Sequence, residues 1–376
     1  MKNNPLVLLI KQVLFNGEQV DVKDWAKLFA FSKGHSLGTL FYYATKDRTD
    51  IPEDTRRAVL RHYLAQINQQ AGQDYLREKL FCAFNDRKID FLPIKGLLLR
   101  DLYPKPEMRT SCDVDFLYKE PQKQMVEKVL TDFGFTKIKE NFNHGEWTSG
   151  IVTVENHQHL YGSNDKFFEY YKDVWDKVKI KQGNEYAFTN EDFYVYFTVH
   201  SAKHFATGGF GMRTLIDTYL YTQKTQLNYD YVSRELSKLG LDVFEKKIKE
   251  LCLYLFSDGE KSEEMDALAK YVLLSGTYGQ DQINASIKAR ETNVGKAKKR
   301  FWLRTIFPSF KTMKTTYPWL KKLPFLLPVA WVIKWFTVIF SRPQRIKQAV
   351  KNAKEINSEK QQFIFNVMEI TNLNKD

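Results

Sequence analysis

The chain has 376 residues, a net charge of +12, and a composition in which 43% of the residues are hydrophobic and 15% are aromatic. This length and apolar content supply a sizeable core, allow two or three domains, and exclude a disordered protein. The three cysteines have no paired spacing, which fits a reducing compartment better than a secreted protein. We therefore expect a cytoplasmic protein.

The N-terminal region, residues 1–88, is predicted to be helical. Residues 22–29 have an amphipathic pattern, and residues 52–86 form a long periodic segment rich in Gln, Arg and Leu. The apolar run at residues 6–10 is broken by Lys11 and is too short for the hydrophobic part of a signal peptide. From the amphipathic and periodic patterns we expect only helices in this region, and from the short apolar run we expect no signal peptide.

The second region, residues 89–189, mixes strand and helix patterns. Two helices are expected, a short one at 96–103 and a longer one at 122–133 that ends at Gly134. Strands are predicted at 89–94, 113–118, 135–139, 145–149 and 151–156. Helix-strand alternation followed by a meander indicates a small mixed sheet with helices on one face, within an α+β fold.

From residue 190 onward the pattern returns to helix, with Asn190 as a predicted N-cap. The pattern divides this half into a helical domain, 190–285, and a basic and apolar helical region, 286–376. The helices are predicted at 190–204, 212–224, 230–256, 262–275 and 342–360.

The C-terminal region concentrates positive charge. Lys288 to Arg304 contains seven basic residues against one Glu. Such a segment is typical of a solvated helix face, and it is also suited to nucleic acid or anionic lipid. We keep both interpretations for residues 288–342, with the cytoplasmic protein then peripheral at the membrane.

Leu323 to Phe340 is the most hydrophobic stretch of the chain. Two prolines and Lys334 interrupt it, and it barely reaches the length that spans a bilayer, so we expect no transmembrane helix. We expect this stretch to pack onto the protein. The alternative is docking at a membrane interface, because tryptophans and flanking basic residues suit that boundary. These residues are Trp319, Trp331, Trp335, Lys321, Lys322, Lys334 and Arg342.

Asp113 and Asp115 are the most informative residues of the chain. On a strand, side chains at i and i+2 project from the same face, so the two carboxylates converge. Converging carboxylates repel unless a cation lies between them, and oxygen ligands suit Mg²⁺. We expect the apolar neighbours Val114, Phe116 and Tyr118 to be spread over both faces of the sheet. The pair therefore predicts a Mg²⁺ site, with Mn²⁺ as the alternative ion.

Several motifs resemble those of the bacterial uncharacterised nucleotidyltransferase family, within the superfamily typified by polymerase beta. The most specific are Lys95-Gly96 followed by Asp113-Val-Asp115. The likeness spans roughly residues 25–221. The other segments that carry it are Leu102-Tyr103-Pro104, Arg109, Thr153-Val-Glu155-Asn-His157, His200-Ser-Ala-Lys-His204, Arg213 and Asp217.

This resemblance implies an enzyme that transfers a nucleoside monophosphate from an NTP, with ATP as the first candidate, to a hydroxyl acceptor. Three carboxylates are expected to bind the metal and act in catalysis: Asp113, Asp115 and Glu155. Nucleotide binding is expected of Lys95, Gly96, Arg109, Lys203 and Arg213. The substrate cleft is expected to contain His157, His200, His204 and Asp217.

Two of these assignments have structural alternatives. Arg109 is an equally good partner for Asp113 or Asp101. Asp217 is an equally good member of a buried polar clamp, paired with Arg213 or a histidine, that fixes the packing of two helices.

Two other functions remain open. His157 with His159 on a strand, and His200 with His204 on a helix, have spacings that are found in zinc sites, which would make the protein a zinc hydrolase. The helical pair lacks the Glu of the HExxH motif. The second alternative is a protein, such as an antitoxin-type binding protein, that keeps the fold without catalysis. Carboxylates paired with Lys or Arg of the fold would favour it.

Overall fold

The computed structural model describes residues 1–111, 113–150, 152–276, 294–341, 344, 347, 349–350 and 357–374. The chain divides into two compact units. The first comprises Met1–His200 and Gly211–Lys261, and the second comprises Ser201–Phe210 and Ser262–Asp376. The four regions expected from the sequence stay a prediction.

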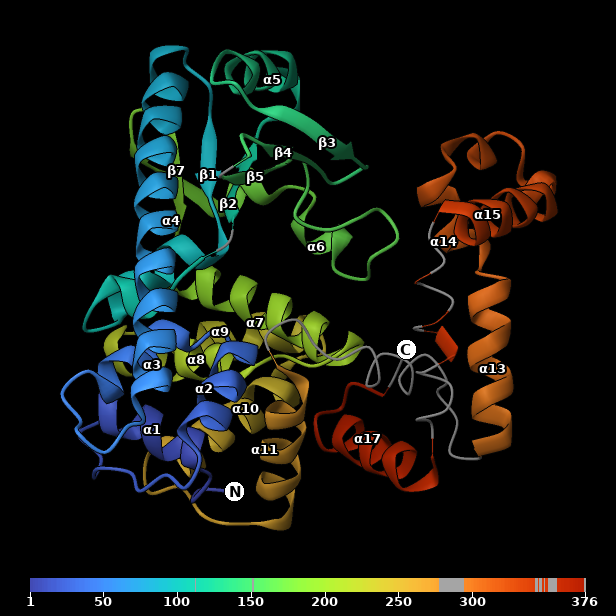
Figure 1. Ribbon diagram of the computed structural model, residues 1–376. Coiled ribbons are helices and arrows are strands. Elements are labelled where there is room, and N and C mark those ends of the chain that lie inside the picture. Colours follow the sequence, from blue (N-terminus) through green and yellow to red (C-terminus); the bar gives the residue numbers. More distant parts are fainter. Residues whose placement is uncertain are drawn as a thin grey trace. The chain divides into compact units, whose positions relative to one another are not determined.

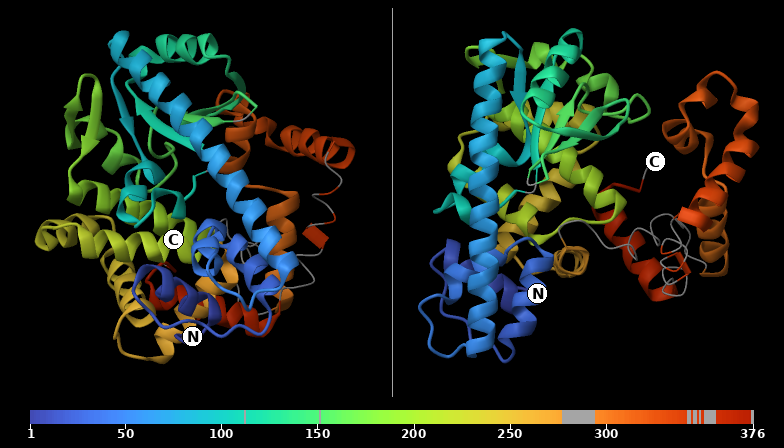
Figure 2. Two further views of the ribbon diagram at one scale, coloured as in Figure 1. Left: turned by 60° about the vertical axis from the view of Figure 1, so that its left-hand side comes forward. Right: turned by 45° about the horizontal axis from the view of Figure 1, so that its top comes forward.

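Helices begin the first unit, as the sequence predicts. They are α1 (Pro5–Leu14), α2 (Trp25–Gly34), α3 (Gly38–Thr45) and the 34-residue α4 (Glu53–Asp86). The side chain of Asp24 accepts a hydrogen bond from the backbone N–H of Lys27, which caps α2 and sets its first turn. The long helix α4 runs beside the sheet (Figures 1 and 2).

The sheet has seven strands in the order β3-β4-β5-β2-β1-β7-β6. The pairs β2–β5 and β1–β7 are parallel and the others are antiparallel, so the predicted mixed sheet is confirmed. Strands β6 and β7 were not predicted. The strands are β1 (Phe91–Pro93), β2 (Asp113–Tyr118), β3 (Thr136–Glu140), β4 (His144–Thr148), β5 (Thr153–His157), β6 (Val178–Gln182) and β7 (Glu185–Phe188).

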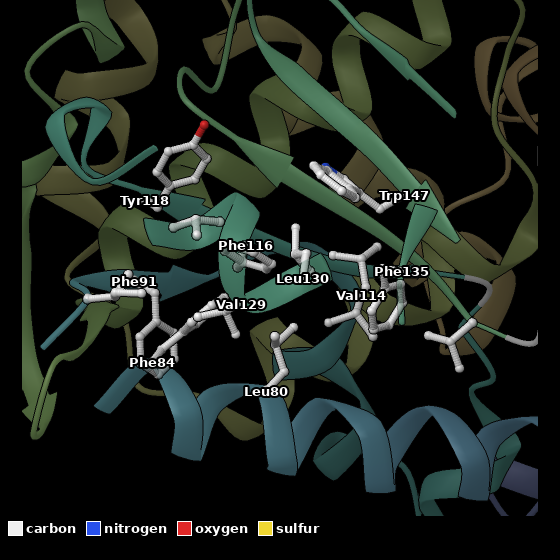
Figure 3. Packing of buried hydrophobic residues seen from close by; sticks show 14 residues of the cluster. Leu80, Phe84, Phe91, Val114, Phe116, Tyr118, Val129, Leu130, Phe135 and Trp147 are labelled. Atoms are coloured by element: carbon white, nitrogen blue, oxygen red, sulfur yellow. The ribbon is translucent and has the colours of Figure 1, made fainter. Parts of the chain in front are cut away.

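One face of the sheet carries the hydrophobic core, in contact with α4 and α5 (Lys123–Asp132). Figure 3 shows Leu80 and Phe84 of α4 and Val129 and Leu130 of α5 around Phe116. Val114, Phe116 and Tyr118 all belong to this one cluster. The expectation that they spread over both faces is wrong, because residues at i, i+2 and i+4 of a strand share a face. The acidic residues therefore occupy the opposite face.

The other helices of the first unit include a 3-10 helix (Lys95–Leu102), α6 (Phe168–Tyr171), α8 (Met212–Lys224), α9 (Tyr229–Lys238) and α10 (Asp242–Phe256). The helix α7 (Asn190–Thr207) belongs to both units. Thr189, rather than Asn190, caps α7, because its Oγ1 accepts from the N–H of Asp192. The helix predicted at 230–256 is two helices, and Gly240 with φ of +66° makes the turn between them.

The second unit contains α11 (Glu263–Ser275), α13 (Val294–Ile306), α14 (Phe310–Thr316), α15 (Leu327–Ser341) and α17 (Ser358–Ile370). Most of the helix predicted at 342–360, the basic residues at 288–293 and Arg342 lie outside the described residues. In the part of the chain that the structure describes, no helix has both the length and the apolar content needed to span a bilayer.

Candidate functional site

Strand pairing brings together two of the three predicted acids. Strands β2 and β5 are parallel neighbours, with Asp115 opposite Glu155 and Leu117 opposite His157. Asp115, Glu155 and His157 each offer one ligand atom, and these atoms all lie within 4.8 Å of one another. Glu155 is thus close enough to Asp115 to share a metal ion with it.

Lys95 enters this group from the turn after β1. Its Nζ donates to Asp115 Oδ1 at 2.6 Å and to Glu155 Oε2 at 3.3 Å. Burial by itself would lower the pKa of Lys95, but the charges of Asp115 and Glu155 outweigh it and raise that pKa above its ordinary value. The Lys95 backbone has φ of +58°, a left-handed conformation that costs a non-glycine residue about 1–3 kcal/mol. This strained turn aims the ammonium group at the carboxylates.

His157 is two residues after Glu155 on β5, on the same face of the sheet, and it contacts both acids. Its Nε2 lies 3.1 Å from Asp115 Oδ1 and 3.4 Å from Glu155 Oε2. The hydrogen bond from His157, together with the charge of Lys95, holds the pKa of Glu155 well below its usual range although burial opposes this. Glu155 is therefore an anion at neutral pH, which is the form that binds a cation.

His144 is a neighbour of the site that the sequence did not reveal. It lies opposite His157 in the pairing of β4 with β5, and the two rings are 5.0 Å apart. Burial lowers the pKa of His144, and the nearby His157 adds to this effect. Only the strand register identifies it, because His144 has no patterned spacing to the other histidines.

Asp113 lies on the same face as Asp115, one strand repeat earlier. The hydroxyl of Ser111 donates to its backbone carbonyl at 3.1 Å and approaches its Oδ1 at 3.4 Å. Burial and the charge of Asp115 raise the pKa of Asp113 to about 6. The group that could hold a metal ion consists of Asp115, Glu155 and His157 and does not include Asp113. The metal-binding role of Asp113 stays a prediction.

Arg109 and Asp217 form a buried clamp. Arg109 Nε and Nη2 donate to the two Asp217 oxygens at 2.7 and 2.9 Å, and the Tyr103 hydroxyl donates to Asp217 at 2.8 Å. Arg109 is 6% exposed and Asp217 is 2% exposed. This placement argues against the predicted phosphate contact of Arg109 and the predicted cleft position of Asp217. A clamp was the alternative, but its partners are Arg109 and Tyr103 rather than Arg213 or a histidine.

Gly96 and Arg213 also contact this part of the fold. Arg109 Nη1 donates to the Gly96 carbonyl at 2.8 Å, and a Cβ at Gly96 would lie 2.7 Å from the same nitrogen. A side chain at Gly96 would therefore force the guanidinium of Arg109 to shift, and the nucleotide-binding role expected of Gly96 stays a prediction. Arg213 Nη1 donates to the carbonyl of Thr110 at 3.1 Å, and its charge acts to lower the pKa of Asp113. Arg213 thus lies near the acidic face.

The other predicted histidines do not join the acids. The His159 ring stacks on Phe142 with 4.7 Å between centroids. Among the described residues, none of the groups of His, Cys, Asp and Glu side chains that lie close enough together to hold a metal ion includes His159, His200 or His204. The predicted zinc site therefore lacks geometric support. His200 is in the first unit, whereas Lys203 and His204 are in the second. The roles expected of these three residues stay predictions.

The protein thus has an α+β fold whose mixed sheet carries acids from two adjacent strands on its polar face. The chain belongs to the uncharacterised nucleotidyltransferase family, whose model matches residues 21–257. This confirms the resemblance found in the sequence and supports nucleotidyl transfer at the level of the family. No curated protein matches the chain. The solution structure of the antibiotic-resistance factor ANT(2'')-Ia matches with 11% identity and a TM-score of 0.36, over 46% of this chain and 92% of that one.

Proposed function

We propose that this protein is a metal-dependent nucleotidyltransferase that moves a nucleoside monophosphate from an NTP, first of all ATP, to a hydroxyl acceptor. The observation that carries the proposal is the convergence of Asp115, Glu155 and His157 within 4.8 Å on the polar face of the sheet, in a chain of this family. Asp113, on the same face, completes the set of acids.

The donor set fits a divalent cation. The two carboxylates suit Mg²⁺ and Mn²⁺, which both prefer oxygen ligands. When bound, such an ion supplies charge neutralisation for the triphosphate. Asp115 and Glu155 would hold it, and the hydrogen bonds of His157 fix the orientation of both carboxylates.

The transfer itself forms a bond between the acceptor oxygen and the α-phosphorus and breaks the bond from that phosphorus to the bridging oxygen. Pyrophosphate leaves, and the hydroxyl proton passes to solvent. In this proposal the residues of the chain position the reactants. In the free protein Lys95 bridges the two carboxylates and offsets their mutual repulsion, and it turns toward the triphosphate when the nucleotide binds.

Calorimetric titration with Mn²⁺ and ATP, followed by intact mass of the protein and of candidate acceptors, tests the proposal. We expect binding that is at least about tenfold weaker in Asp115→Asn and Glu155→Gln, as for loss of a metal ligand. Asp47→Asn is the control, because its carboxylate is 84% exposed and remote from the sheet acids in sequence. Equal affinity in wild type, Asp115→Asn and Asp47→Asn would refute the metal assignment.

One observation favours a second function, a binding protein that keeps the fold without catalysis. Lys95 contacts both Asp115 and Glu155, as a permanent internal counter-ion would. In that case no mass shift would appear in any acceptor after incubation of the wild-type protein with NTP and Mn²⁺. A mass shift of an acceptor that the wild type produces and Asp115→Asn does not would exclude it.

A further inference from the structure

The helix α15 in the second unit has an unusual distribution of apolar side chains. Residues that repeat at three- and four-residue spacing on a helix share a face. The outward face of α15 is entirely apolar apart from Thr337 at its edge. Its large exposed residues are Val329, Val332, Ile333, Phe336, Ile339 and Phe340. Phe336 is 58% exposed and Phe340 is 76% exposed.

The opposite face of α15 carries polar side-chain atoms that form hydrogen bonds within the second unit. Trp331 Nε1 donates to the carbonyl of Pro308, Lys334 Nζ to that of Thr305, and Trp335 Nε1 to that of Ile306, with lengths of 2.9, 2.7 and 2.7 Å. The last two carbonyls belong to the C-terminal end of α13, where a cation is favourable. The usual arrangement of a surface helix is therefore inverted.

A small core fixes this orientation. Three side chains are buried together, Met313 of α14, Leu320 of the 3-10 helix Pro318–Lys321, and Ala330 of α15, with Trp331 packed against them. The ring of Phe307 lies edge-on to Trp331 and to Trp335, with centroids 5.1 and 5.3 Å apart. The helices α14 and α15 lie side by side in Figure 1. Because α15 is anchored by one face, its apolar face cannot turn inward without breaking these contacts.

The apolar surface continues beyond the helix and is accompanied by positive charge. Leu323 and Phe325, in the turn before α15, are also exposed, and Phe325 is 73% exposed. Lys321 and Lys322 are exposed immediately before them. Between residues 294 and 341 the sequence contains Lys and Arg but no Asp or Glu. The partner that this segment fits is both apolar and anionic.

We propose that α15 and the preceding turn, residues 321–340, dock on an anionic lipid bilayer, lying in the interface without crossing it. The exposed Phe, Ile and Val side chains enter the acyl region, and Lys321 and Lys322 contact the headgroups. Nucleic acid matches the charge but offers no apolar phase for this face. The docking is independent of the transfer reaction and of the residues assigned to it.

Co-sedimentation of the whole 376-residue chain with lipid vesicles tests this inference. One set of vesicles is phosphatidylcholine alone, and the other contains phosphatidylglycerol as well. We expect binding to the anionic vesicles that weakens with salt. Phe336→Asp combined with Phe340→Asp should weaken it at least about tenfold, and Lys321→Gln combined with Lys322→Gln about tenfold. Tyr75→Asp combined with Ile180→Asp, at exposed positions of the first unit, is the matched control and should bind as wild type.

Circular dichroism of each variant verifies the fold, and the lysine variant gives the answer if the phenylalanine variant does not fold. The inference is overturned if wild type sediments with neither vesicle, binds both equally, or binds unchanged in both variants. It is also overturned if the protein is a dimer that Phe336→Asp with Phe340→Asp makes monomeric without any vesicle binding. A second copy of the chain would then cover this face.

Discussion

The replacement Asp217→Asn probes the buried clamp. Asp217 accepts two hydrogen bonds from Arg109 and one from Tyr103, and it is 2% exposed. Asparagine keeps the size but removes the charge, which leaves the guanidinium of Arg109 buried without a counter-ion. Loss of one partner from a buried pair costs about 3–5 kcal/mol. At about 2–4 °C for each kcal/mol, we expect Tm to fall by roughly 6–20 °C.

Differential scanning calorimetry measures this fall, and two further variants interpret it. Asp132→Asn breaks the exposed pair with Arg87 and should cost at most about 1 kcal/mol. Arg109→Met combined with Asp217→Leu removes both buried charges and should recover much of the lost stability, because neither charge is then stranded. Wild-type Tm in Asp217→Asn together with lost nucleotide binding would refute the clamp and place Asp217 in the cleft.

Three further variants test the neighbouring residues. Lys95→Met should strengthen Mn²⁺ binding in the absence of nucleotide, because the ammonium group no longer competes with the ion for Asp115 and Glu155. We expect a gain of about tenfold in affinity, which corresponds to about 1.4 kcal/mol. Unchanged affinity in calorimetry would contradict this. Gly96→Ala should lower the free energy of unfolding by about 1–3 kcal/mol, because its Cβ would lie 2.7 Å from Arg109 Nη1. Gly34→Ala, with open space around its Cβ, is the control for thermal melts. His157→Ala should weaken Mn²⁺ binding by about 10–100-fold with little change in Tm, and wild-type affinity would remove it from the site.

The sequence predicted the mixed sheet because strand alternation and turn residues are local properties. The same alternation places Asp113 and Asp115 on one face, whatever the strand pairs with. The Glu155 and His157 positions follow from the same rule on β5, once the family resemblance has singled them out. The nucleotidyltransferase family was therefore identifiable from the motifs at residues 95–157, and the match over residues 21–257 confirms it.

The tertiary structure alone decided which charges meet. Arg109 looked suited to a phosphate, but its partner Asp217 is 108 residues away, and no local pattern encodes that contact. Lys95 reaches the acids through a left-handed backbone that its residue type does not suggest. His144 joins His157 only through the register of β4 with β5. Charge and strand period are properties of single residues and short segments, whereas pairing and burial depend on which distant segments pack together.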